Sequence, residues 1–73
     1  MAMQVTTPPR FIKLPTVKNR TSLSTSEIYR RIEDGTFPAQ IKLGSKSVAW
    51  LEHEVNSWIS KKIEQARQGE VTE

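Results

Sequence analysis

The stretch Ser24-Thr25-Ser26-Glu27 constrains the fold of this chain more than any other feature. A Ser at a helix N-cap and a Glu three residues later form a capping box, in which each side chain accepts a hydrogen bond from the other residue's backbone N–H. Ile28 and Ile32 follow one turn apart on one face, and Gly35 is the residue type that commonly ends a helix. The sequence therefore predicts a capped helix from Ser24 to Gly35.

A shorter helix is predicted just before it. Pro15 suits the first position of a helix, because its missing N–H would have no partner there. We expect this helix to run to about Arg20 and to bury Val17, with a turn at Thr21-Ser22. Two helices joined by a turn of three or four residues are typical of a DNA-reading helix-turn-helix.

Hydrophobic periodicity predicts the remaining elements. Residues 40–43 and 47–50 alternate apolar with polar side chains around a turn that contains Gly44, which indicates a β-hairpin. From about Glu52 the apolar residues return to helical spacing. They are Val55, Trp58, Ile59 and Ile63. The predicted fold is mainly α with a small β-hairpin, a winged helix-turn-helix.

The length of 73 residues allows one domain, which we place at residues 10–64. We expect residues 1–9 to be a disordered arm and residues 65–73 a flexible tail, with Gly69 stopping any helix there. The four apolar aromatic residues Phe11, Phe37, Trp50 and Trp58 are expected in the core, which argues against single-strand binding through exposed aromatic side chains.

The composition limits the cellular compartment and the classes of partner that we expect. The chain has no cysteine, no apolar run of membrane-spanning length and no signal-peptide pattern, so we expect a cytoplasmic protein without a membrane partner. The formal net charge is +3, and Glu64, Glu70 and Glu73 all lie near the C-terminus, which leaves the rest more basic. Clustering of basic residues is expected in a protein that binds a polyanion, although a solvated basic surface would have the same composition.

The capped helix carries the candidate DNA-reading residues. Ser24, Thr25 and Ser26 are small hydroxyl residues beside the first-turn N–H groups, which suit phosphate oxygens. With Ile28 and Ile32 inward, Ser26 and Arg30 lie on the opposite side, where an Arg can bind guanine or phosphate, and Tyr29 flanks them. Taken singly, Ser24 is better explained as a helix cap and Arg30 as a solvated charge. Together with the short turn, the basic hairpin and the chain length, these residues favour DNA recognition.

The hairpin provides a second candidate surface. Lys42 and Lys46 and the hydroxyl groups of Ser45 and Ser47 lie near its tip, where they could contact the adjacent groove or backbone as a wing does. The alternative is an edge hairpin whose lysines prevent aggregation, and both roles are compatible.

No catalytic pattern is present in the sequence. His53, the single histidine, lies between Glu52 and Glu54, but adjacent residues on a helix point in different directions, so the sequence predicts no metal site. Phosphate-binding glycine loops and nucleophile motifs are absent as well. We expect neither an enzyme nor a cofactor.

Three runs of residues resemble the AlpA family of prophage and mobile-element regulators. They are Leu23-Ser24-Thr25-Ser26-Glu27-Ile28-Tyr29-Arg30-Arg31-Ile32; Gly35-Thr36-Phe37-Pro38 with Ile41-Lys42-Leu43-Gly44; and Val48-Ala49-Trp50-Leu51-Glu52-His53-Glu54-Val55-Asn56-Ser57-Trp58-Ile59. The resemblance implies an excisionase-like or MerR-like winged helix-turn-helix. It assigns Ser24, Thr25, Ser26, Tyr29 and Arg30 to the recognition helix, and Lys42, Gly44, Ser45 and Lys46 to the wing. Family members often have Gly where Ser22 stands, and a small hydroxyl residue where Glu27 stands.

The function that this resemblance implies is sequence-specific binding of double-stranded DNA, in transcription regulation, excision or both. The alternative is a non-enzymatic adaptor that binds an integrase or a host regulator. Candidate partners are therefore double-stranded DNA and, beside it, an integrase or recombinase or RNA polymerase. We expect a monomer or weak self-association on DNA.

Overall fold

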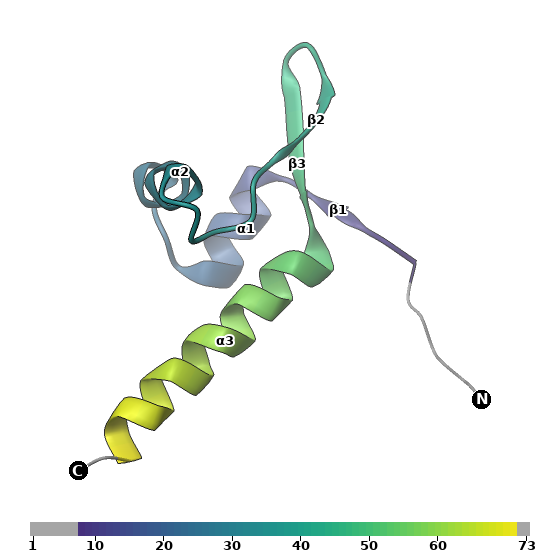
Figure 1. Cartoon of the computed structure of the whole chain (residues 1–73). Helices are drawn as coiled ribbons and strands as arrows, with labels where there is room; N and C mark the ends of the chain where they lie inside the picture. Colours follow the sequence, from purple (N-terminus) through teal and green to yellow (C-terminus); the bar gives the residue numbers. More distant parts are fainter. Residues whose placement is uncertain (1–7, 72–73) are drawn as a thin grey trace.

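The computed structural model describes residues 8–71, with side chains up to residue 69, and its order is strand, two helices, hairpin and a long helix. The elements are β1 (Phe11–Ile12), α1 (Leu14–Thr21), α2 (Thr25–Glu33), β2 (Ile41–Gly44), β3 (Ser47–Leu51) and α3 (Glu52–Val71). In Figure 1 the β2–β3 hairpin projects to one side of the molecule, and α3 extends away from the other elements. The predicted helix-turn-helix with a hairpin wing is confirmed.

The turn between α1 and α2 is built from hydroxyl residues. Pro15 lies in the first turn of α1 as predicted, and α1 ends at Ser22, which has a φ of 64°. The Thr21 hydroxyl donates to the Val17 carbonyl at 2.8 Å and accepts from the Leu23 N–H at 3.3 Å. The chain thus changes direction within the three residues between α1 and α2.

The capping box predicted for α2 is present, with Ser24 as its N-cap. At the other end Gly35 has a φ of 78°, and its N–H donates to the Ile32 carbonyl at 3.0 Å. The following N–H, that of Thr36, donates to the Arg31 carbonyl at 2.8 Å. Both ends of α2 therefore form as the sequence predicted, from contacts among neighbouring residues.

The sheet has three strands, one more than the sequence predicted, in the order β1-β3-β2. Phe11 and Ile12 were expected only as an apolar lead-in, but they pair antiparallel with Leu51 and Trp50 of β3. The Glu52 N–H also donates to the Arg10 carbonyl at 2.8 Å. A two-residue strand shows no alternation of its own, so its pairing could not be predicted.

A small apolar core lies where the helices meet one face of the sheet. Six buried side chains form it: Ile12, Val17, Ile28, Phe37, Trp50 and Val55. The Trp50 indole N–H donates to the Pro38 carbonyl at 3.0 Å, which satisfies the polar atom of this fully buried side chain. The burial predicted for Val17, Ile28, Phe37 and Trp50 is confirmed.

Three residues expected in the apolar interior lie further out. Phe11 is 52% exposed, because successive residues of a strand point to opposite faces and Ile12 occupies the core side. Leu43, expected on the apolar face of β2 with Ile41, is 45% exposed. Trp58 is only half-buried and packs edge-on against Phe37, with ring centroids 5.0 Å apart.

The C-terminal helix is longer than the sequence predicted. It does not end near Glu64 but continues through Gly69 to Val71, so that the expected stop at Gly69 is wrong. Gln, Ala and Arg in this stretch favour helix, and one Gly costs only about 1 kcal/mol relative to Ala. Ile63, predicted on the buried face, is 46% exposed because this half of α3 extends beyond the core (Figure 1).

The predicted arm falls mostly on residues 1–7, and the end of the predicted tail falls on 72–73. Both lie outside the described residues. Between residues 8 and 71, no helix combines the length and the apolar character needed to cross a membrane.

Candidate nucleic-acid interface

One face of α2 is exposed along its whole length. Ile28 is fully buried and Ile32 packs against the core, whereas Ser26, Arg30 and Glu33 are exposed. At 3.6 residues per turn, these three positions fall within about 60° of arc. We call them the α2 stripe. The exposure predicted for Ser26 and Arg30 is confirmed, while Glu33, which continues their spacing by one turn, was not recognised in the sequence.

The capping box fixes the start of this helix. The Ser24 hydroxyl accepts from the Glu27 N–H at 3.1 Å, and the Glu27 carboxylate accepts from the Ser24 N–H at 2.8 Å. The hydrogen bond from the Ser24 backbone N–H lowers the pKa of Glu27 below its usual 4.5. A hydrogen bond with the Ser24 side chain and the positive charges of Arg30 and Arg31 lower it further. The carboxylate is thus ionised and held at the N-terminal end of α2, beside Arg30 of the stripe.

The N–H groups of Thr25 and Ser26 have no intrahelical partner, because they belong to the first turn. Ser26 is exposed and Thr25 is half-buried. The sequence placed Ser24, Thr25 and Ser26 together at this end of α2, and the structure confirms their position. Short side chains and the unpaired N–H groups of this first turn suit an anion such as a phosphate oxygen, while the ionised Glu27 carboxylate at the same end opposes it.

Each side of the stripe is bordered by a half-buried residue. Tyr29 packs edge-on against Trp50 of β3, with ring centroids 6.3 Å apart. On the other side lies Glu27 and, beyond it, Arg31. The Arg31 guanidinium lies 5.9 Å from the centre of the Trp58 ring, and its Nε is buried without a hydrogen bond. Arg31 therefore packs inward against α3. Through Tyr29 the stripe is linked directly to the strand that leads into the hairpin.

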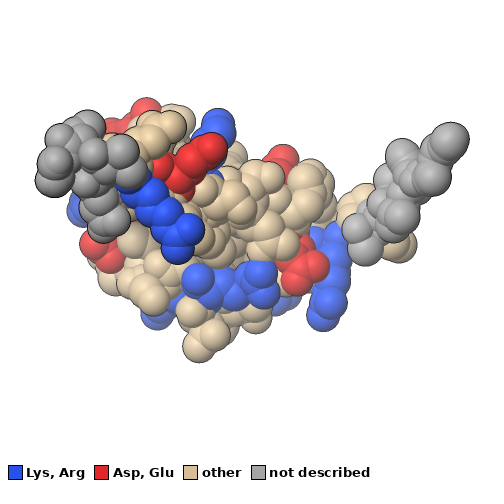
Figure 2. Space-filling view, turned by 90° about the horizontal axis from the view of Figure 1, so that it is seen from below, with Lys and Arg blue, Asp and Glu red and all other residues tan. Residues whose placement is uncertain are grey.

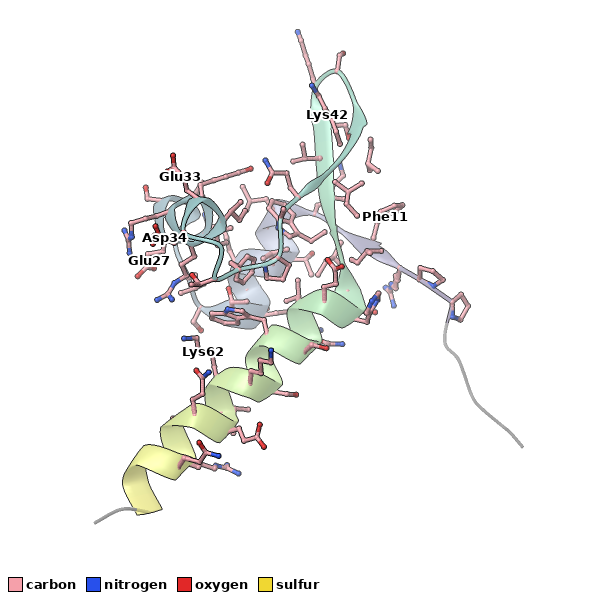
Figure 3. The ribbon with its side chains drawn as sticks, viewed as in Figure 1. Phe11, Glu27, Glu33, Asp34, Lys42 and Lys62 are labelled. Carbon is pink, nitrogen blue, oxygen red and sulfur yellow. The ribbon has the colours of Figure 1, made fainter. Side chains whose placement is uncertain are left out.

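The hairpin exposes most of the predicted wing residues. Lys42, Gly44, Ser45 and Lys46 are exposed, and the pairing of β2 with β3 is irregular between Lys42 and Gly44. Figure 3 labels Lys42 on the projecting part of the hairpin. The wing therefore presents its lysines to solvent, at some distance from α3.

Ser47 differs from the other predicted wing residues. It is half-buried, and its hydroxyl accepts a hydrogen bond from the Lys13 ammonium at 3.0 Å. Lys13, which the sequence did not single out, thus belongs to the base of the wing. This contact depends on the pairing of β1 with β3, so no local signal in the sequence could have predicted it.

A second basic contact joins the first helix to the last. The Arg20 guanidinium donates to the side-chain oxygen of Asn56. Figure 2 views the molecule from the side of α3 and shows acidic as well as basic side chains there. This face therefore has no single sign of charge, unlike the exposed hairpin tip, where Lys42 and Lys46 are the charged residues.

The acidic residues around His53 do not form a binding cluster. His53 is exposed at the start of α3, and Glu52 and Glu54 are half-buried. Over the described part of the chain, no three His, Asp or Glu side chains are arranged to hold a metal ion.

Comparison with known proteins identifies the family. Residues 10–63 match the family described as prophage CP4-57 regulatory protein (AlpA). An uncharacterized protein, ORF88 of Enterobacteria phage P4, is 43% identical over 63 residues, which cover 86% of this chain and 72% of the phage protein. The DNA-binding transcriptional activator AlpA of Escherichia coli (strain K12) is 36% identical over 59 residues, which cover 73% of this chain and 84% of that protein. The matched region contains α1, α2, the hairpin and more than half of α3, and the chain belongs to the AlpA family.

Proposed function

We propose that this protein is a sequence-specific double-stranded DNA-binding regulator of a prophage or integrative element. It acts in transcription regulation, in excision, or in both. The observation that carries the proposal is the α2 stripe, an exposed row of polar side chains on a capped helix linked through Tyr29 and Trp50 to a hairpin with lysines near its tip. The relative from Escherichia coli is a DNA-binding transcriptional activator by name, which supports this function.

The two surfaces suit different parts of a duplex. An α-helix fits the major groove, so the α2 stripe can reach base edges while the first turn of α2 binds a phosphate. Lys42 and Lys46 are flexible point charges suited to the backbone beside it. In this arrangement α2 contributes sequence selectivity and the hairpin contributes general affinity. Ser45 and Gly44 allow the hairpin tip to approach the backbone closely.

A binding titration tests this function. Fragments flanking the gene and random duplexes of equal length are titrated with the protein at several salt concentrations. We expect one flanking fragment to bind at least about 10³ times more tightly than random duplex, as specific regulators commonly do. The logarithm of the binding constant should fall linearly with that of the salt concentration. Equal weak binding to every fragment would contradict sequence-specific function.

A second candidate function is that of a protein adaptor, and one observation favours it. By the strand register, Phe11, Ile41 and Leu51 lie on the sheet face opposite Trp50. Phe11 is among the most exposed large apolar residues. An integrase or recombinase, or RNA polymerase, could bind this face. Association with such a partner, without any duplex binding at low salt, would support the adaptor over the DNA-binding regulator.

A further inference from the structure

Glu33 places a negative charge at the C-terminal end of the α2 stripe, the surface that faces DNA in the proposed function. It follows Arg30 by three residues and Ser26 by seven, and all three side chains are exposed. In Figure 3 Glu33 points to the side of α2 toward which the hairpin projects, whereas Glu27 points elsewhere. Of the two glutamates of α2, Glu33 is thus the one that would meet the duplex.

The two carboxylates also differ in their partners. Glu27 is held by the capping box, which uses its oxygen as a hydrogen-bond acceptor. Neither Glu33 nor Arg30 forms a hydrogen bond or close ion pair through its side chain within residues 8–71. Glu33 is therefore available to a ligand, and Arg30 is attracted to Glu27 without a close ion pair. In a complex, an unpartnered carboxylate close to phosphates would weaken binding unless it accepts a hydrogen bond from a base.

Neighbouring residues of the stripe are spaced to reach neighbouring base pairs. Base pairs are about 3.4 Å apart along the duplex axis and somewhat further apart along the inclined major groove that a recognition helix follows. Between Arg30 and Glu33 the rise is about 4.5 Å, a little more than one step. These two side chains therefore reach neighbouring base pairs when α2 lies along the major groove.

We propose that Glu33 is a specificity-determining residue that selects cytosine. Its carboxylate accepts a hydrogen bond from the cytosine N4 amine, the one major-groove donor of that base, next to the guanine that Arg30 binds. This assignment rests on the proposed DNA-binding function. Arg30 and Glu33 thus contact two adjacent base pairs. Glu33 lowers the affinity for any duplex that lacks cytosine at the second of these positions.

Selection from a random duplex pool tests the assignment. The purified wild type, Arg30→Ala and Glu33→Gln are each used to enrich duplexes, which are then sequenced. We expect Arg30→Ala to lose one guanine preference, and Glu33→Gln to lose a cytosine preference at the neighbouring position by about 5- to 100-fold. Gln can bind adenine N6 and N7, so adenine should become enriched at that position.

Asp34→Asn is the matched control, because it removes a neighbouring carboxylate outside the stripe. It should leave the enriched sequence unchanged. If Glu33→Gln binds every sequence more tightly and keeps the same base preference, Glu33 only repels phosphates, and the proposal is overturned. The proposal is also overturned if Glu33→Gln selects the same sequences as wild type. A wild type that enriches no sequence would instead overturn the proposed function. Circular dichroism confirms folding of each variant, which is expected because the substituted side chains are exposed.

Discussion

Ser22 ends α1 in a conformation that suits glycine better than serine. Its φ of 64° is left-handed, where a Cβ atom crowds the following carbonyl. We expect Ser22→Gly to raise the free energy of unfolding by up to about 1 kcal/mol. Urea denaturation measures this change. Ser26→Gly, inside α2, is the control and should lower it by roughly 0.5–1 kcal/mol. A Ser22→Gly protein less stable than wild type would show that the serine hydroxyl matters more than the backbone strain.

The capping box makes stability depend on pH through Glu27. Its pKa is lower in the folded protein than the usual 4.5, so the ionised carboxylate stabilises the fold above that pH. This contribution is lost as the pH falls below 4.5 and through the lower pKa of the folded state. Glu27→Gln should therefore be less stable than wild type at pH 7, and the difference should shrink in acid.

Thermal melting of both proteins between pH 7 and pH 3 checks this expectation. Ser24→Ala removes the other half of the box and should cost about 1 kcal/mol at neutral pH. A gap between wild type and Glu27→Gln that stays constant over the whole range would mean that the charge of Glu27 does not contribute to stability.

At the scale of elements, Trp58 fixes α3 to the loop after α2. Its ring packs against Phe37, and its indole N–H donates to the Thr36 carbonyl at 2.8 Å. Trp58→Ala should destabilise the domain by about 3 kcal/mol, the low end for loss of a Trp, because the side chain is only half-buried. Trp58→Phe keeps most of the packing but loses the hydrogen bond, and should cost less.

Chemical denaturation followed by circular dichroism measures both substitutions. Ile63→Ala is the control on the same helix, since Ile63 is 46% exposed and its loss should change stability little. If Trp58→Ala unfolds at the same urea concentration as wild type, α3 is not anchored to the rest of the domain through this residue.

Elements defined by neighbouring residues were predictable from the sequence, and those defined by distant contacts were not. The ends of α2 follow from Ser24, Glu27 and Gly35, all close to one another in the chain. Strand β1 exists only because Phe11 and Ile12 meet β3. The far end of α3 was misplaced because Gly69 was given more weight than the helix-favouring residues before it.

At the scale of the whole molecule, the parts of the candidate site that depend on neighbouring residues were also predictable, and those that depend on distant contacts were not. The exposure of Ser26 and Arg30 could be predicted because Ile28 is one of the buried core residues of the same helix. The role of Ser47 could not, because its partner Lys13 reaches it only once β1 has paired with β3. The packing of the half-buried Tyr29 against Trp50 likewise required the folded structure, and it joins α2 to the strand that leads into the hairpin.

The contact between Tyr29 and Trp50 holds α2 beside the hairpin, and we expect these two elements to make different kinds of contact with DNA. Arg30 lies on the α2 stripe, so Arg30→Ala should weaken binding to the specific duplex by about 1–3 kcal/mol and to random duplex by less. Lys46 is exposed at the hairpin tip and should contact phosphate alone. Lys46→Ala should therefore weaken binding to both duplexes alike, and make the slope of log affinity against log salt shallower by about 1.

Titrations of both variants with specific and random duplex at several salt concentrations measure these effects. Lys61→Ala, an exposed lysine on α3, is the control and should bind like wild type. If Arg30→Ala and Lys46→Ala lose equal affinity on both duplexes, Arg30 is only another backbone contact. If neither variant changes binding, the DNA-binding surface is not formed by α2 and the hairpin, and the apolar sheet face with Phe11 becomes the better candidate for the functional surface.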